Sequence, residues 1–176
     1  TTENRNNKQH FESRMIAANI PLDTIQRIQG HIAENQLARL QLRDQAVRED
    51  WINSLEYSEK MHELSDPARG IREQFGEDIF DQYLYASEIN NRVVVQQVFS
   101  GSAAETAGIK AGDIIESYAS SKIFTMNDLR QITVQGVAGE TVLVELYRDG
   151  SLMNTALPRG PLGISMSVTG VDPNQH

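Results

Sequence analysis

The chain has 176 residues, of which 39% are hydrophobic and 23% charged, which is typical of a folded globular chain and excludes disordered or low-complexity classes. A formal net charge of −8 and the lack of any run of Lys or Arg exclude a surface built for nucleic acid. The chain has no cysteine, so disulfides, thiol nucleophiles and thiolate metal sites are excluded as well.

Residues 1–19 are polar, rich in Asn and without a sustained apolar period, so we expect a flexible tail that is frayed or partly helical. From Pro21 to Leu64, in contrast, apolar residues recur at helical spacing. They are Ile25, Ile28 and Ile32, followed by Leu37, Leu40, Val47, Trp51 and Leu55. This pattern predicts one long helix or two abutting helices, with a bend or break where the apolar stripe changes phase, between Ile32 and Leu37.

Two further helices are expected before the pattern of the sequence changes from helical to strand-like. Ser65-Asp66-Pro67 is typical of a helix start, because Asp66 can cap free amide groups and Pro67 loses no hydrogen bond in the first turn. Gly76 is typical of a helix end, and apolar residues recur between Glu77 and Ala86. Residues 20–88 are therefore predicted to form a helical appendage.

Strand patterns dominate after Asn91. Residues 92–98 form a β-branched run, residues 141–147 alternate with period two, and Asp149-Gly150 is a hairpin turn signal ahead of another strand. Between these strands, Thr125 and Asp128 form a capping box at the start of one helix.

The most specific stretch, residues 101–115, has the sequence G-S-A-A-E-T-A-G-I-K-A-G-D-I-I. Its small residues let a short helix lie close to a sheet, and Gly108 and Gly112 suit turns with positive φ. Asp113 can bond neighbouring backbone amides. The stretch resembles the PDZ domains of bacterial envelope proteins, whose hallmark is a strand, G-S-P-A, a short helix, A-G-L and G-D-x-I. Ala103 stands where that family often has proline.

The resemblance continues downstream, where the family has a capped helix, G-E-x-V and an R-D-G hairpin. This chain has G-E-T-V at residues 139–142 and R-D-G at residues 148–150. The resemblance covers residues 89–170 and leaves 171–176 as a C-terminal tail. It implies a small PDZ-like β-barrel or sandwich of five to six strands, capped by two helices. With the helical N-terminal region predicted before it, the fold class is expected to be α+β.

The peptide-binding loop of this family, G-Φ-G-Φ, commonly precedes the first strand, yet residues 88–92 contain no glycine. A comparable loop, Leu162-Gly163-Ile164, lies instead at the far end of the chain. We therefore predict a circular permutation, in which Ile164–Val168 pairs antiparallel with Val93–Val98 and faces the helix of residues 125–133 across a groove.

The resemblance implies that backbone N–H groups of such a loop hold the terminal carboxylate of a peptide and that an apolar pocket takes its last side chain. The predicted peptide-binding residues are Arg159, Leu162, Gly163, Ile164 and Met166 from the loop and strand, with Thr125, Leu129 and Ile132 from the facing helix.

Individual roles follow from the residue types. Arg159 would assist the carboxylate directly or through water, or would be an ordinary surface charge. Gly163 would allow the carboxylate to approach, so a valine there is expected to block it and leave the core untouched. Pro161 stands in place of the first glycine of the G-Φ-G-Φ loop, and it removes one backbone N–H donor. Leu129 and Ile132 can equally be core residues, and Thr125 can simply cap its helix.

No catalytic or metal-binding constellation is recognised in the sequence. His62-Glu63 lacks the second histidine that an H-E-x-x-H zinc helix requires, and no G-x-S-x-G elbow is present. We therefore predict no enzyme activity, no metal and no cofactor.

The favoured function is a non-catalytic module of a bacterial envelope protein that docks a polypeptide C-terminus or an extended peptide by strand addition. Two alternatives stay open: a regulatory PDZ fragment of an envelope protease, or a scaffold resembling the inner-membrane C-component of type II secretion. No apolar run approaches the ~20 residues of a membrane span. We expect a periplasmic location with an inner-membrane anchor outside these residues, and self-association through the helical region as one role for the appendage.

Overall fold

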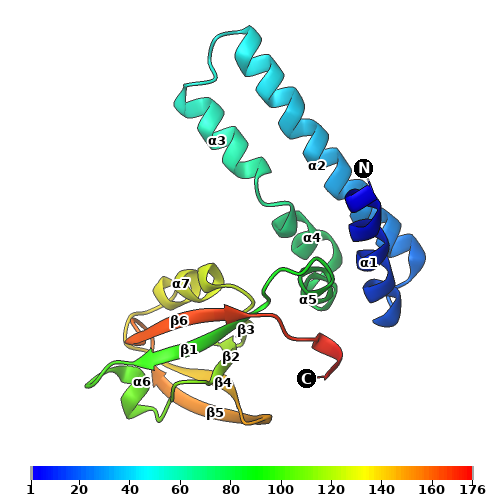
Figure 1. The fold of residues 1–176 in the computed structure, drawn as a ribbon. Coiled ribbons are helices and arrows are strands. Elements are labelled where there is room, and N and C mark those ends of the chain that lie inside the picture. The colour runs from blue at the N-terminus through cyan, green and yellow to red at the C-terminus, as the bar shows by residue number, and fades with distance from the viewer. Residues whose placement is uncertain (1, 176) are drawn as a thin grey trace. The chain divides into compact units, whose positions relative to one another are not determined.

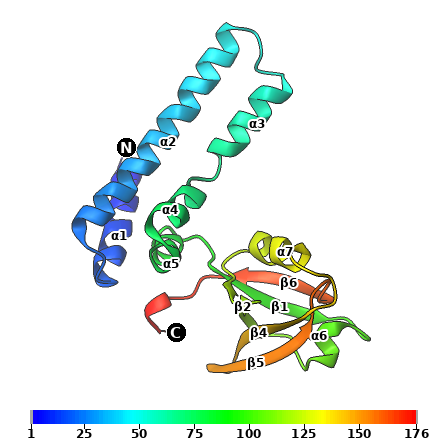
Figure 2. The same ribbon diagram turned by 180° about the vertical axis from the view of Figure 1, so that it is seen from behind.

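The computed structural model describes residues 2–175, including the side chains of all of these except 2–6, 67 and 69. The chain divides after Ala86 into two compact units. The first unit is helical and the second combines a sheet with helices, which confirms the α+β class (Figures 1 and 2). None of the helices in the described part is long and apolar enough to cross a lipid bilayer.

The first unit contains α1 (Thr2–Ala17), α2 (Leu22–Arg48), α3 (Leu55–Leu64), α4 (Pro67–Phe75) and α5 (Glu77–Ala86). The second contains β1 (Arg92–Val98), α6 (Ala103–Thr106), β2 (Ile114–Tyr118), β3 (Ser121–Lys122), α7 (Met126–Val134), β4 (Thr141–Arg148), β5 (Ser151–Pro158), β6 (Ile164–Thr169) and the short 3₁₀ turn η1 (Pro173–Gln175).

The N-terminal segment, expected to be a frayed or partly helical tail, forms one continuous helix that packs against α5. Met15 is fully buried, and the Phe11 ring meets the Tyr83 ring edge-on at 6.0 Å. The Arg14 guanidinium donates a 3.0 Å hydrogen bond to the carbonyl oxygen of Tyr85. Two apolar side chains four residues apart are enough to dock this helix, and that is too short a stripe to be recognised in a polar sequence.

The break predicted between Ile32 and Leu37 is wrong, because α2 runs through that region without interruption. The chain leaves the helix at residues 49–54 instead. Asp50 takes a left-handed conformation with φ of 58°, and the Trp51 N–H bonds the Ala46 carbonyl oxygen at 2.9 Å, as in a Schellman end. The Ser54 hydroxyl then accepts from the Tyr57 N–H at 3.1 Å and starts α3.

The other predicted helix boundaries are confirmed. α4 begins at Pro67 and ends at Phe75, followed by Gly76 with φ of 86°. In the second unit, the Thr125 side chain caps α7 and Asp128 completes the capping box.

The sheet has the strand order β5-β4-β2-β1-β6, with β3 paired to β2, and all neighbours are antiparallel. The β4–β5 hairpin turns at Asp149 and Gly150, as predicted, and their φ values of 51° and 77° are typical of a type I′ turn. β3 was not predicted, because two residues carry no readable period. The strands β5 and β6 are the two edges of the sheet.

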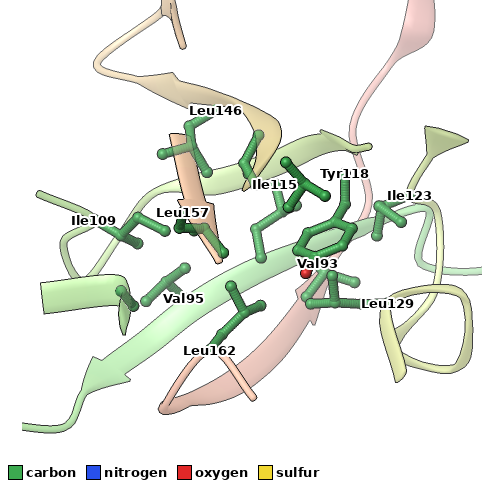
Figure 3. Close-up of a cluster of buried hydrophobic side chains, with 13 residues drawn as sticks. Val93, Val95, Ile109, Ile115, Tyr118, Ile123, Leu129, Leu146, Leu157 and Leu162 are labelled. Atoms are coloured by element: carbon green, nitrogen blue, oxygen red, sulfur yellow. The ribbon is translucent and has the colours of Figure 1, made fainter. Parts of the chain in front are cut away.

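One apolar cluster fills the second unit; its buried members come from β1, β2, β4, β5, α6, α7 and the connecting loops, and Ile164 and Met166 of β6 pack against it (Figure 3). Figure 3 shows Leu129, from α7, and Leu162, from the loop before β6, pointing toward Val93 and Val95 of β1. Both leucines are buried. The cluster therefore joins the helix and the loop that flank β6 to the same core.

A buried carboxylate fixes the turn between α6 and β2. Asp113 accepts two 2.7 Å hydrogen bonds from Arg148 and one of 2.8 Å from the Lys110 N–H. Burial acts to raise the pKa of Asp113, but these hydrogen bonds and the neighbouring positive charges outweigh it, so its pKa lies below the ordinary value. The side-chain hydrogen bonds from Arg148 to Asp113 in turn raise the pKa of Arg148.

Candidate functional site

The pairing predicted for the C-terminal strand is confirmed. β6 runs antiparallel to β1, with Ile164 opposite Val98, Met166 opposite Val95 and Val168 opposite Val93. Directly opposed residues share one face of a sheet, and Val93 and Val95 face the core. Ile164 and Met166 therefore lie on the core side of β6, where each is half-buried.

The backbone of β6 offers hydrogen-bonding groups at the open edge of the sheet. Val95 directs its N–H to the Asp113 carbonyl oxygen and its own carbonyl oxygen to the Gly112 N–H, both at 2.8 Å and both away from β6. In an antiparallel ladder the opposed residue, Met166, then also points its N–H and C=O away from the shared side, toward the open edge.

The backbone groups of Ile164, two residues before Met166, also face the open edge. The Phe99 N–H donates to the carbonyl oxygen of Gly163 at 2.9 Å, so Gly163 faces β1. Because the direction alternates along a strand, the N–H and C=O of Ile164 face outward. No strand of the described residues lies beyond β6, so the backbone groups of Ile164 and Met166 are open to pairing with a further strand.

α7 lies beside β6 in both views of the ribbon (Figures 1 and 2). Leu129 of this helix is 2% exposed and belongs to the core, whereas Ile132 is half-buried at its edge. The Thr125 hydroxyl accepts from the Asp128 N–H at 3.1 Å, so the helix cap engages it. Of the three predicted helix residues, Ile132 thus keeps the most accessible apolar surface.

The loop before β6 rests on α6. The Leu162 carbonyl oxygen accepts from the Ala104 N–H at 3.0 Å, and the Leu162 side chain is 6% exposed. Gly163 has φ of 75°, and a Cβ there would lie 2.3 Å from the Cβ of Ser102. A side chain at 163 would therefore collide with the start of α6, and the expectation that valine leaves the core untouched is wrong.

Arg159 is bound within the protein. Its Nε donates to Glu140 Oε1, its Nη1 donates to the Ile132 carbonyl oxygen at 2.7 Å, and its guanidinium lies 5.7 Å from the centre of the Tyr118 ring. The Arg159 side chain is 11% exposed. Arg159 is therefore not an ordinary solvated surface charge. Its contacts join the loop before β6 to the last turn of α7, so its charge is not reserved for a ligand.

Glu140, Ser102 and Tyr118 are the contributors to this site that sequence reasoning missed. Glu140 accepts from both Arg159 and the Val137 N–H, Ser102 fills the space above Gly163, and Tyr118 lies under Arg159. Glu140 had a signal in the G-E-x-V motif, but Ser102 and Tyr118 meet the loop only through the fold. Among the described residues, no group of three or more His, Cys, Asp or Glu side chains is placed to hold a metal ion.

Comparison with known proteins places the second unit among PDZ domains. The PDZ domain family matches residues 71–158. Serine protease Do-like HtrA of Lactococcus lactis subsp. lactis (strain IL1403) is 34% identical over 111 residues, which cover 61% of this chain and 27% of that protein. Serine protease Do-like HtrA of Bacillus subtilis (strain 168) is 41% identical over 71 residues, 40% of this chain and 16% of that protein. This chain thus spans about a quarter or less of the length of these curated relatives.

Two solved structures of PDZ domains show weak overall similarity to this chain. The PDZ domain of the SdrC-like protein from Listeria monocytogenes has a TM-score of 0.39 at 15% identity, over 43% of this chain and 87% of that one. The HtrA3 PDZ domain bound to a phage-derived ligand (FGRWV) has a TM-score of 0.33 at 16% identity, over 47% and 88%. The family match ends at Pro158, so Arg159, the loop and β6 lie outside it.

Proposed function

This chain belongs to the PDZ domain family, and from that premise we propose that its C-terminal unit binds an extended polypeptide segment as an added strand along β6. The observation that carries the proposal is the pair of outward-facing peptide groups at Ile164 and Met166, on an edge strand with α7 beside it. Main-chain bonds to those groups supply affinity that tolerates different sequences.

The order of elements supports a circularly permuted version of the domain. Residues 71–86, at the start of the family match, are helical in α4 and α5 and supply no strand before β1. The strand next to β1 comes from Ile164–Thr169 at the end of the chain. We propose that β6 takes the place that a strand preceding β1 has in the unpermuted order.

Side-chain selection is proposed to come from the core side of β6. Ile164, Met166 and Ile132 are half-buried and would contact the side chains of the ligand, and Leu129 and Leu162 are buried in the core next to them. Such a surface suits a peptide with an apolar end. Because the contact is small and a flexible peptide must be ordered, we expect dissociation constants on the order of micromolar.

Capture of a terminal carboxylate is proposed to rely on backbone N–H groups near Gly163. Among them is the N–H of Ile164, which points toward the open edge of the sheet. Pro161 has no N–H, and the Arg159 charge is already engaged by Glu140. A peptide with a free carboxylate should therefore bind more tightly than its C-terminal amide, but by a modest factor of about ten or less.

The wider role is proposed to be non-catalytic docking in the bacterial envelope, with an anchor outside these residues. The relatives named as serine proteases support a second candidate, a regulatory PDZ fragment of a protease. Full-length coding sequence decides between them: a protease domain on the same chain establishes the second candidate, and its absence rules that candidate out. Fractionation of cells that express the full-length protein tests the envelope location.

Met166→Pro is the sharpest test of strand addition. Proline removes the outward N–H without removing a bond to β1, and edge strands tolerate it. Met166→Ala is the matched control, because it loses the same side chain but keeps the N–H. With a peptide selected from a library, calorimetry should show affinity about tenfold weaker for the proline variant than for the alanine variant. Equal affinities in two folded variants would place the ligand elsewhere.

A further inference from the structure

An open groove of about 650 Å³ lies between α2 and α3 in the helical unit. Its walls include Arg39, Leu40 and Arg43 from α2 and Tyr57 and Met61 from α3, with Ile52 at the connection between the helices. The groove therefore combines an apolar lining with two guanidinium groups on one wall. It belongs wholly to the first unit and is independent of the β6 edge.

The two helices that form the groove do not complete a core of their own. No residue of α3 is buried, and Leu40 and Leu55 are 66% and 74% exposed. Val47, 56% exposed, continues the face of Leu40 and Arg43, because the spacing of three and then four residues keeps all three on one side of α2. A third helix laid against this face would bury these side chains, as in a three-helix core.

Among the described residues, the two guanidinium groups on the groove wall have no hydrogen-bond or ion-pair partner. Three other cations of this unit have ion-pair partners: Arg48 with Asp44, Lys60 with Glu56, and Arg72 with Glu77. Arg39 and Arg43, four residues apart on one face, make no hydrogen bond or ion pair with the described side chains. In a chain of net charge −8, two unpaired positive charges beside an apolar groove mark a place for carboxylates.

We propose that the α2–α3 groove binds an acidic amphipathic helix of another protein, with its apolar side chains on Leu40, Tyr57 and Met61 and its carboxylates on Arg39 and Arg43. Helix-in-groove recognition has this division between an apolar stripe and flanking charges. A second copy of this chain fits less well, since two grooves face to face would bring the arginines of both copies together.

The test uses the whole chain and two synthetic helical peptides of about 20 residues, long enough to hold a helix. One has leucine at helical spacing flanked by glutamate, and the other has lysine in place of every glutamate. Fluorescence anisotropy of labelled peptide should show binding of the glutamate peptide and not of the lysine peptide. Equal binding of the two peptides, or binding of neither, overturns the proposal.

Charge reversal in the protein locates the site. Arg43→Glu should weaken the glutamate peptide about tenfold or more, whereas Arg48→Glu, the same change outside the groove, should leave affinity within about twofold. Arg39→Glu repeats the test, and circular dichroism establishes that each variant is folded. Equal loss in the groove and control variants contradicts the site. Sedimentation showing a dimer that Arg43→Glu dissociates makes the second copy the occupant and also overturns the proposal.

Discussion

Arg159 Nη1 donates a 2.7 Å hydrogen bond to the carbonyl oxygen of Ile132, which ties the loop before β6 to the last turn of α7. The two residues are brought together from opposite walls of the proposed peptide site. The same guanidinium binds Glu140 and lies over Tyr118. Arg159 is thus a positioning residue, which holds α7 at a fixed place relative to β6.

Replacing Arg159 with Met should loosen this connection. Methionine keeps much of the packing of the arginine stem but leaves the Ile132 carbonyl oxygen without its donor, so we expect a loss of about 2 kcal/mol in the free energy of unfolding. Peptide affinity should fall as well, because the helix wall is no longer held. Urea denaturation and calorimetry measure the two effects. Arg130→Met, an exposed site on α7, is the control, and equal behaviour of the two variants would contradict the positioning role.

Gly163 and Ser102 should be coupled in a double-mutant cycle. Gly163→Ala places a Cβ 2.3 Å from that of Ser102 and also strains a backbone with φ of 75°. In the Ser102→Gly background only the backbone strain remains, about 1–2 kcal/mol, and the lost cap costs a few tenths. We expect the alanine to cost clearly more beside Ser102 than beside glycine, measured by denaturant unfolding. Additive costs would show that the two residues do not touch.

Asp113 should make the second unit sensitive to acid. Its pKa is lower in the folded protein than its ordinary value. A carboxyl with a depressed pKa stabilises the fold fully above its unfolded pKa of about 4, and this stabilisation is lost as the pH falls through the folded pKa. The free energy of unfolding should therefore drop between about pH 5 and pH 2.

Asp113→Asn is the variant that checks this dependence. It should be less stable at neutral pH, because the buried Arg148 contact loses its charge, and its stability should change less over the acid range. Asp149→Asn, at the exposed hairpin turn, serves as the control and should keep the wild-type dependence. Parallel pH profiles for wild type and Asp113→Asn would refute the assignment.

Short sequence patterns predicted the structural elements that are determined by a few neighbouring residues. The Thr125–Asp128 capping box and the Asp149-Gly150 turn lie where expected, because each is complete within a few residues. The end of α2 at Asp50 was missed, since a left-handed aspartate leaves no mark that distinguishes it from an ordinary helical one. The docking of α1 was also missed, because Phe11 and Met15 acquire meaning only against α5.

In the proposed peptide site, too, part of the structure was predicted from the sequence and part depends on tertiary contacts. The antiparallel pairing of β6 with β1 was predicted from the position of the Leu162-Gly163-Ile164 loop within the PDZ resemblance, and it is confirmed. The role of Arg159 was not predictable in the same way, because Ile132, Glu140 and Tyr118 reach it only through the tertiary fold. Gly163 was singled out from the sequence for a ligand, and the structure adds a second reason for glycine at this position, the close approach of Ser102.

Amide hydrogen exchange along β6 tests strand addition most directly, because it reports each N–H separately. In the free protein, Ser165 and Ser167 face β1 and should exchange slowly, whereas Ile164 and Met166 face the open edge and should exchange fast. Saturation with a selected peptide should slow exchange at Ile164 and Met166 and leave Ser165 and Ser167 little changed. Unchanged exchange at Ile164 and Met166, or new protection along β5 instead, would contradict the account.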